Sequence, residues 1–84
     1  MNTSDRVGKG PRPFRVYNAA SLGTAIRYFR KAEELSQGEL AERVGMSRYY
    51  LTALENGKET EHLQRILAVL RELGLRITLD RADW

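Results

Sequence analysis

The chain has 84 residues, no cysteine, a single histidine and a formal net charge of +3. This length is enough for one small domain with one modest core, which argues against a complex active site. The lack of cysteine excludes a disulfide framework and a thiolate metal site, and because His62 has no companion ligand, we expect no metal and no cofactor.

The first predicted segment, residues 1–17, is a basic and flexible tail. It carries Arg6, Lys9, Arg12 and Arg15 against only Asp5, and it lacks a helical period. Two interpretations stay open: an arm that lies along DNA phosphates or in a minor groove, or a solvated terminus. From residue 19 onward ten basic side chains meet ten acidic ones, so bulk charge alone does not indicate nucleic-acid binding.

The domain of residues 18–84 is expected to begin with a helix over residues 19–34, for which Asn18 is a suitable N-cap. Apolar residues at helical spacing predict its buried face: Leu22, Ala25, Ile26, Phe29 and Ala32.

Two short helices follow, joined by a glycine turn. Ser36 with Glu39 forms a capping box that starts the first, and Gly45 supplies the permissive backbone that ends it. Ser47 then caps the second helix, whose first turn remains free to approach DNA. The face shared by the two helices is expected to bury Leu40, Ala41, Val44, Leu51 and Leu54.

A last helix is predicted over residues 60–73, ending at Gly74. Its apolar side comprises Leu63, Ile66, Leu67, Leu70 and Leu73.

Residues 75–80 alternate apolar and polar side chains, which indicates a strand. Because a lone strand cannot satisfy its own backbone groups, we expect it to pair with its copy in a homodimer and to bury Leu75, Ile77 and Leu79. Pairing with residues 14–17 and a frayed end are the alternatives. The expected fold class is mainly all-α: a repressor-type bundle of four to five helices with a C-terminal β-strand that pairs across a homodimer.

A family resemblance covers roughly residues 18–80. It is carried by the pattern Ser36-Gln-x-Glu-Leu-Ala, Val44-Gly, Ser47 and Leu54-Glu-Asn-Gly-Lys58, which resembles the helix-turn-helix of the Cro/repressor type, often called the XRE family. The single strand after Gly74, in place of a further helix, resembles the C-terminal end of the HipB-type antitoxins, a subgroup of this family. That resemblance implies a homodimer that represses its own operon on double-stranded operator DNA and binds a HipA-like Ser/Thr kinase toxin.

The resemblance also implies the residues that meet DNA: Gln37, Ser47, Arg48, Tyr49, Tyr50, Thr52 and Lys58. Gln37 is assigned to a phosphate, a contact that its amide and the helix N-terminus suit chemically.

The resemblance places four residues of the second helix and its cap where relatives read base edges: Ser47, Arg48, Tyr49 and Thr52. Arg48 is either a guanine reader or a phosphate clamp. Tyr49 is suited to a thymine methyl group or a phosphate, and Tyr50 to a phosphate, with packing as its alternative. A structural ion pair between Arg30 and Glu55 is implied as well, so Glu55 is not interpreted as catalytic.

Three functions follow, none of them enzymatic. The first is an antitoxin that represses its operon, and the second is a stand-alone, prophage-like regulator without a toxin. The third is a protein-interaction adaptor that does not bind DNA. The sequence shows neither a membrane-spanning apolar run nor a signal peptide, so we expect a cytoplasmic, bacterial protein associated with the nucleoid.

Overall fold

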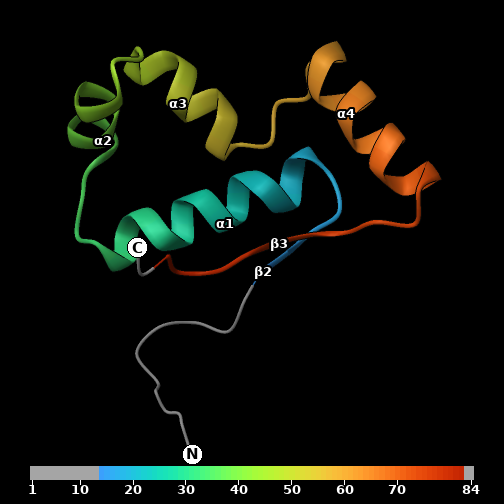
Figure 1. Cartoon of the computed structure of the whole chain (residues 1–84). Helices are drawn as coiled ribbons and strands as arrows, with labels where there is room; N and C mark the ends of the chain where they lie inside the picture. The colour runs from blue at the N-terminus through green and yellow to red at the C-terminus, as the bar shows by residue number, and fades with distance from the viewer. Residues whose placement is uncertain (1–13, 83–84) are drawn as a thin grey trace, which may run out of the picture.

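The computed structural model describes residues 14–82, and the expectations for residues 1–13, 83 and 84 lie outside them. The described part is mainly helical, with a small two-stranded antiparallel sheet (Figure 1). Its elements in chain order are β2 (Phe14–Val16), α1 (Ala19–Ala32), α2 (Gln37–Val44), α3 (Arg48–Glu55), α4 (Glu61–Glu72) and β3 (Ile77–Leu79). None of the helices in this range is long and apolar enough to cross a membrane.

The helix starts are those that the capping residues predict. The side chains of Asn18, Ser36, Ser47 and Thr60 each accept a hydrogen bond from the backbone N–H three residues later. Each bond satisfies one of the donors that a helix N-terminus leaves unpaired. Asn18 and Ser36 form full capping boxes, so the local chemistry of the chain fixes where α1 and α2 begin.

Helix α1 is the central element of the fold. It packs against α3 on one side and against β2 on the other, while α2 packs on α3 and α4 lies at the opposite end from α2 (Figure 1). Two small residues of α1, Ala19 and Ala25, are among the most buried, at 3% and 0% exposed. Leu51 of α3 and Ala41 of α2 are buried as well.

The sheet corrects the expected partner of the C-terminal strand. β3 pairs with β2 of the same chain, in the register Phe14 to Leu79 and Val16 to Ile77. The aromatic ring of Phe14 packs on Tyr28 and Phe29 of α1, with ring centroids 5.3 and 5.7 Å apart. These contacts hold β2 beside β3, so the pairing does not require a second copy. Assigning residues 14–16 to a flexible tail was therefore wrong, because they form a strand of the sheet.

Several residues expected in the core are instead exposed. On α4, Leu67 is buried and Leu63 and Leu70 are half-buried, but Ile66 is 44% and Leu73 65% exposed. Val44 at the end of α2 and Ala32 at the end of α1 are also exposed. The apolar spacing of α4 predicted the helix correctly but overestimated how much of its apolar side this chain covers.

Candidate nucleic-acid interface

The turn between α2 and α3 sets the angle at which α3 is presented. Gly45 ends α2 in the left-handed region, with φ of 75°. The next backbone N–H, of Met46, donates to the Ala41 carbonyl at 3.0 Å. Ser47 then caps α3 by accepting from the Tyr50 N–H at 3.0 Å. The N-terminus of α3 is consequently held against α2 while its first turn stays at the surface.

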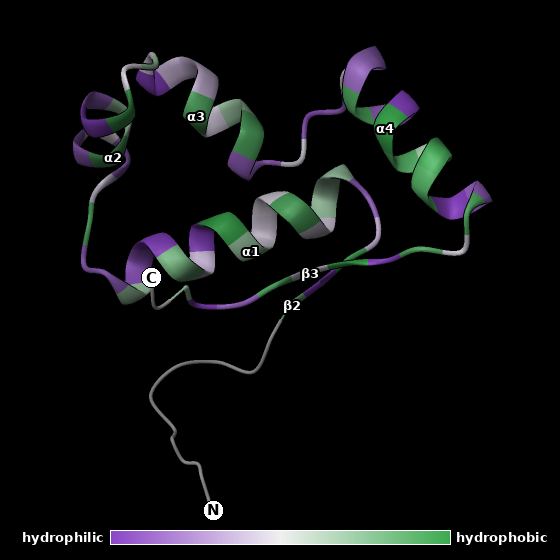
Figure 2. Ribbon diagram, in the orientation of Figure 1, coloured by the Kyte–Doolittle hydropathy of each residue, from purple (hydrophilic) through white to green (hydrophobic). Residues whose placement is uncertain are grey.

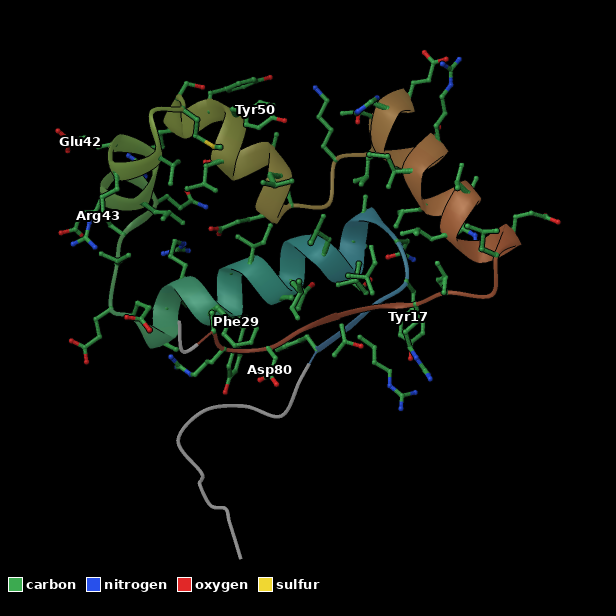
Figure 3. The ribbon with its side chains drawn as sticks, in the orientation of Figure 1. Tyr17, Phe29, Glu42, Arg43, Tyr50 and Asp80 are labelled. Atoms are coloured by element: carbon green, nitrogen blue, oxygen red, sulfur yellow. The ribbon has the colours of Figure 1, made fainter. Side chains whose placement is uncertain are left out.

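Three long side chains project from this first turn of α3. Arg48 is exposed, and Tyr49 and Tyr50 are 78% and 54% exposed. Figure 3 shows Tyr50 on the side of α3 away from α1. The opposite side of the helix carries Leu51 and Glu55, which are buried. Large side chains with planar polar or aromatic ends thus stand on the exposed side of a fixed helix.

A chain of hydrogen bonds joins α2, α3 and α1 beneath this surface. The Thr52 hydroxyl donates to Gln37 Oε1 at 2.8 Å, and Gln37 Nε2 donates to Glu55 Oε1 at 3.0 Å. Glu55 in turn accepts from Arg30 Nε at 2.6 Å and from a second guanidinium nitrogen at 3.0 Å. Sequence reasoning anticipated the Arg30–Glu55 pair but missed its connection to Gln37 and Thr52, whose side chains turn toward each other.

The Arg30–Glu55 ion pair at the base of these hydrogen bonds is almost completely buried. The side chains of Arg30 and Glu55 are 8% and 1% exposed. Burial alone raises the pKa of the Glu55 carboxyl, but the hydrogen bonds from Arg30 and Gln37 outweigh it and hold that pKa below its ordinary value. The same hydrogen bond raises the pKa of Arg30. Both groups are therefore charged, and Gln37 is attached to a fixed anion.

Gln37 is the first residue of α2 and directly follows the capping residue Ser36. Glu39 completes the capping box by accepting from the Ser36 N–H at 2.7 Å, and this bond lowers the pKa of the Glu39 carboxyl. Around Gly38, a side-chain Cβ would find no atom other than Ser36 Oγ within 4 Å. The Glu39 N–H donates to Ser36 Oγ, so Gln37 and Gly38 carry the N–H groups of this turn for which the helix itself supplies no acceptor.

A shallow hollow lies along one side of α3 and the loop that follows it. It encloses about 80 Å³ and is lined by Tyr49, Tyr50, Ala53, Leu54, Lys58 and Thr60. Lys58 is brought there because its backbone N–H donates to the Ala53 carbonyl at 3.0 Å. The fold therefore gathers both tyrosines and Lys58 at one edge of α3, with Ala53 between them.

The remaining predicted residues lie apart from this surface. Ile77 and Leu79 are half-buried in β3, on the side of α1 opposite α3 (Figure 1). Leu75 precedes that strand and is 53% exposed. The candidate site accordingly consists of α2, α3 and the loop that follows α3.

Comparison with known proteins gives one family and several relatives. Residues 26–79 match the family described as helix-turn-helix. An uncharacterized HTH-type transcriptional regulator of Sinorhizobium fredii is 35% identical over 65 residues, which cover 77% of this chain and 86% of that protein. The ImmF control region 10 kDa protein of Bacillus phage phi105 is 44% identical over 65 residues, covering 74% of this chain and 71% of the phage protein.

A third relative is the antitoxin HipB of Escherichia coli. It is 26% identical over 65 residues, which cover 77% of this chain and 74% of HipB. No solved structure gives a significant match to the chain.

Proposed function

Because this chain belongs to the helix-turn-helix family of the XRE/Cro type, we propose that it is a transcriptional repressor that places α3 in the major groove of double-stranded operator DNA. The observation that carries the proposal is the exposure of Arg48, Tyr49 and Tyr50 on the first turn of a helix fixed against α2. A DNA-reading helix needs that combination, since its side chains must reach base edges without moving the scaffold.

In this proposal Gln37 docks the protein on a phosphate. An amide nitrogen has two hydrogens, and the bond to Glu55 uses only one of them. The second hydrogen and the free N–H groups at the start of α2 together suit a phosphate oxygen. Thr52, which donates to the oxygen of the same amide, then orients Gln37 instead of contacting a base.

Base recognition falls to the exposed side of α3. The Arg48 guanidinium can bond O6 and N7 of one guanine, and the Tyr49 ring and the Ala53 methyl suit a thymine methyl group. Ser47 already accepts from Tyr50 N–H, so its hydroxyl proton is free for a phosphate or base acceptor. The Tyr50 hydroxyl and the Lys58 ammonium, at the edge of the hollow, are assigned to phosphate.

The experiment that tests this function compares Arg48→Ala with Arg43→Ala on a panel of operator sequences. Both arginines are exposed, but Arg43 lies on α2, where Figure 3 shows it pointing away from α3. Loss of Arg48 should remove about 1–3 kcal/mol of discrimination at one guanine, whereas loss of Arg43 should leave that discrimination unchanged. If Arg48→Ala weakens the affinity for all sequences alike, Arg48 is a phosphate clamp. If the unmodified chain binds no operator, the proposed function is overturned.

A finer assignment concerns the partner. The likeness to HipB supports an antitoxin that represses its own operon and holds a HipA-like Ser/Thr kinase. The higher identity to a phage control-region protein supports the second candidate, a stand-alone regulator without a toxin. Capture of the tagged chain from its host, with and without nuclease, separates them: a kinase that stays bound after nuclease treatment identifies the antitoxin, and promoter DNA without a protein partner identifies the regulator.

A further inference from the structure

A hollow lies between α4 and the small sheet. It encloses about 240 Å³, and its apolar lining comprises Val16, Leu67, Leu70, Leu75 and Ile77. Val16 and Leu67 are only 5% and 4% exposed, so the hollow reaches from the surface to the core. Figure 2 shows hydrophobic residues on α4 and along the segment that runs from α4 into β3. The hollow therefore has apolar walls on both sides.

The chain itself does not fill this space. Helix α4 packs less closely on the rest of the fold than α1, α2 and α3 pack on one another (Figure 1). The lining atoms consequently lack apolar neighbours, and an apolar group that enters the hollow gains both these contacts and its own removal from water. Pockets for drug-sized ligands measure about 300–1,000 Å³, so the size of this hollow suits a shorter chain.

Two arginines line the same hollow close to Tyr17. Arg71 Nη1 donates to the Tyr17 carbonyl at 3.2 Å, which uses only one of the N–H groups of that guanidinium. Arg76 directly precedes Ile77, and Tyr17 directly follows the strand partner of Ile77, Val16. Figure 3 shows Tyr17 next to the segment that joins α4 to β3. The fold thus brings both arginines to the part of the hollow where the two strands begin to pair.

The charge around the hollow is positive. The described residues that line it include no carboxylate, and neither Arg71 nor Arg76 forms an ion pair with a carboxylate of residues 14–82. Glu72 follows Arg71 on α4 but does not line the hollow. Arginine side chains commonly lay their methylene groups on an apolar surface and keep the guanidinium in water at its edge. The hollow therefore combines an apolar interior with a cationic rim.

We propose that this hollow binds a short alkyl carboxylate, with the alkyl chain between α4 and the sheet and the carboxylate at Arg71 and Arg76. A guanidinium matches a planar carboxylate through two parallel N–H bonds, and each buried methylene group adds to the affinity. None of the lining residues belongs to α2, α3 or the loop after α3, so the site is separate from the proposed DNA surface. It does not depend on the proposed function.

The test titrates octanoate into the full chain without DNA and follows isoleucine methyl groups by NMR. Ile77 lines the hollow, whereas Ile66 is 44% exposed on α4 and Ile26 lies in α1. The Ile77 signal should shift and saturate, while the other two signals stay in place. No saturable shift at Ile77 would overturn the proposal, which is also the result if a second copy of the chain covers the hollow. An equal shift at Ile66 would reveal adsorption to the exposed side of α4 and would overturn the proposal as well.

Two further ligands separate the contributions of the alkyl chain and the carboxylate. Octylammonium keeps the alkyl chain and reverses the charge, and acetate keeps the carboxylate without the chain. Both should bind at least about tenfold more weakly than octanoate, because one meets like charges at the rim and the other leaves the apolar walls uncovered. Equal affinities for octanoate and octylammonium would contradict the role of the arginines, and equal affinities for octanoate and acetate that of the hollow.

Arg76→Gln tests the rim directly and leaves the bond between Arg71 and Tyr17 in place. It should weaken octanoate binding about three- to tenfold. Arg65→Gln is the matched control, because it removes the same charge from an exposed position of α4 that does not line the hollow, and it should bind octanoate like the unmodified chain. Both variants change exposed side chains and should keep their helical circular dichroism. Equal losses of affinity would attribute binding to net charge alone and overturn the proposal.

Discussion

At the scale of single residues, Glu55 connects the stability of the fold to the proposed DNA surface. Its buried carboxylate accepts from Arg30 of α1 and from Gln37 of α2. Gln37 is also the residue assigned to the DNA phosphate, so the group that docks the protein is oriented by the group that joins the helices. A change at Glu55 should consequently affect folding and DNA binding together.

Replacing Glu55 with glutamine should strongly destabilise the domain. The substitution keeps the shape of the side chain but leaves the Arg30 guanidinium buried without a counter-charge, which costs about 3–5 kcal/mol. Urea denaturation of Glu55→Gln measures this loss. Glu42→Gln is the control, because Glu42 is exposed on α2 and its replacement should change the free energy of unfolding by less than about 0.5 kcal/mol. If Glu55→Gln also changed the free energy of unfolding by less than about 0.5 kcal/mol, the role given to the Arg30–Glu55 pair would be contradicted.

The same carboxyl predicts how stability depends on pH. The pKa of Glu55 is lowered in the folded chain, so as pH falls the unfolded state takes up the proton first and gains relative stability. The contribution of Glu55 is therefore fully present above the ordinary glutamate pKa of about 4.3 and is lost as pH falls through the lowered value. The urea concentration at the midpoint of unfolding should therefore decrease as the pH is lowered from neutral into the acid range. The midpoint should decrease less steeply with falling pH in Glu55→Gln than in the unmodified chain. Parallel curves for the two proteins would contradict the contribution given to Glu55.

This residue also shows where sequence reasoning stopped. The Arg30–Glu55 pair was expected only because the chain resembles a family in which these positions are paired. The bonds from Thr52 to Gln37 and from Gln37 to Glu55 connect residues 15 and 18 positions apart, and they depend on the angle between α2 and α3. No local pattern encodes that angle, so the positioning role of Thr52 became visible only in the folded chain.

At the scale of helices, the starts could be predicted and the contacts between helices could not. Ser36 and Ser47 determine where α2 and α3 begin through bonds within three residues, which a sequence displays directly. How closely α1 approaches α3 depends instead on Gly23, which sequence reasoning did not single out. A Cβ at Gly23 would lie 2.4 Å from the Leu54 carbonyl oxygen and 2.6 Å from that of Glu55.

Gly23→Ala should therefore separate α1 from α3. Both clashing atoms belong to the backbone and cannot rotate away, so the substitution should destabilise the domain by about 1–3 kcal/mol or more, despite the better helix propensity of alanine. Gly38→Ala is the matched control, since Gly38 is also helical and a Cβ there meets nothing closer than 3.9 Å. Thermal unfolding of the two variants compares them. Equal melting temperatures would contradict the close packing of α1 on α3.

At the scale of the whole molecule, the sheet unites the two ends of the described chain. β2 and β3 are separated by all four helices, yet they pair in register and flank α1. The alternation of residues 75–80 predicted a strand but carried no information about its partner, because hydrogen-bonding groups on a strand edge accept any other strand. Packing determines that β2 is the partner of β3, because the Phe14 ring holds β2 against Tyr28 and Phe29 of α1. β2 is thus part of the folded domain, and the basic residues before it can be removed without deleting a residue of the sheet.

Deleting residues 1–12 should leave the domain folded and test whether the tail binds DNA. The deleted segment contains Arg6, Lys9 and Arg12 but none of β2. If the tail lies along DNA, the slope of log affinity against log salt should fall by about 0.9 for each of these side chains that contacts a phosphate. A full-length variant with all three changed to glutamine should give the same slope, because it removes the charges and keeps the length. An unchanged slope would identify the tail as a solvated terminus.

Deletion through Val16 should lower the melting temperature as well, because it removes the partner of β3 and the Phe14 ring. Comparing the two deletions therefore separates a loss of DNA contacts from a loss of the fold.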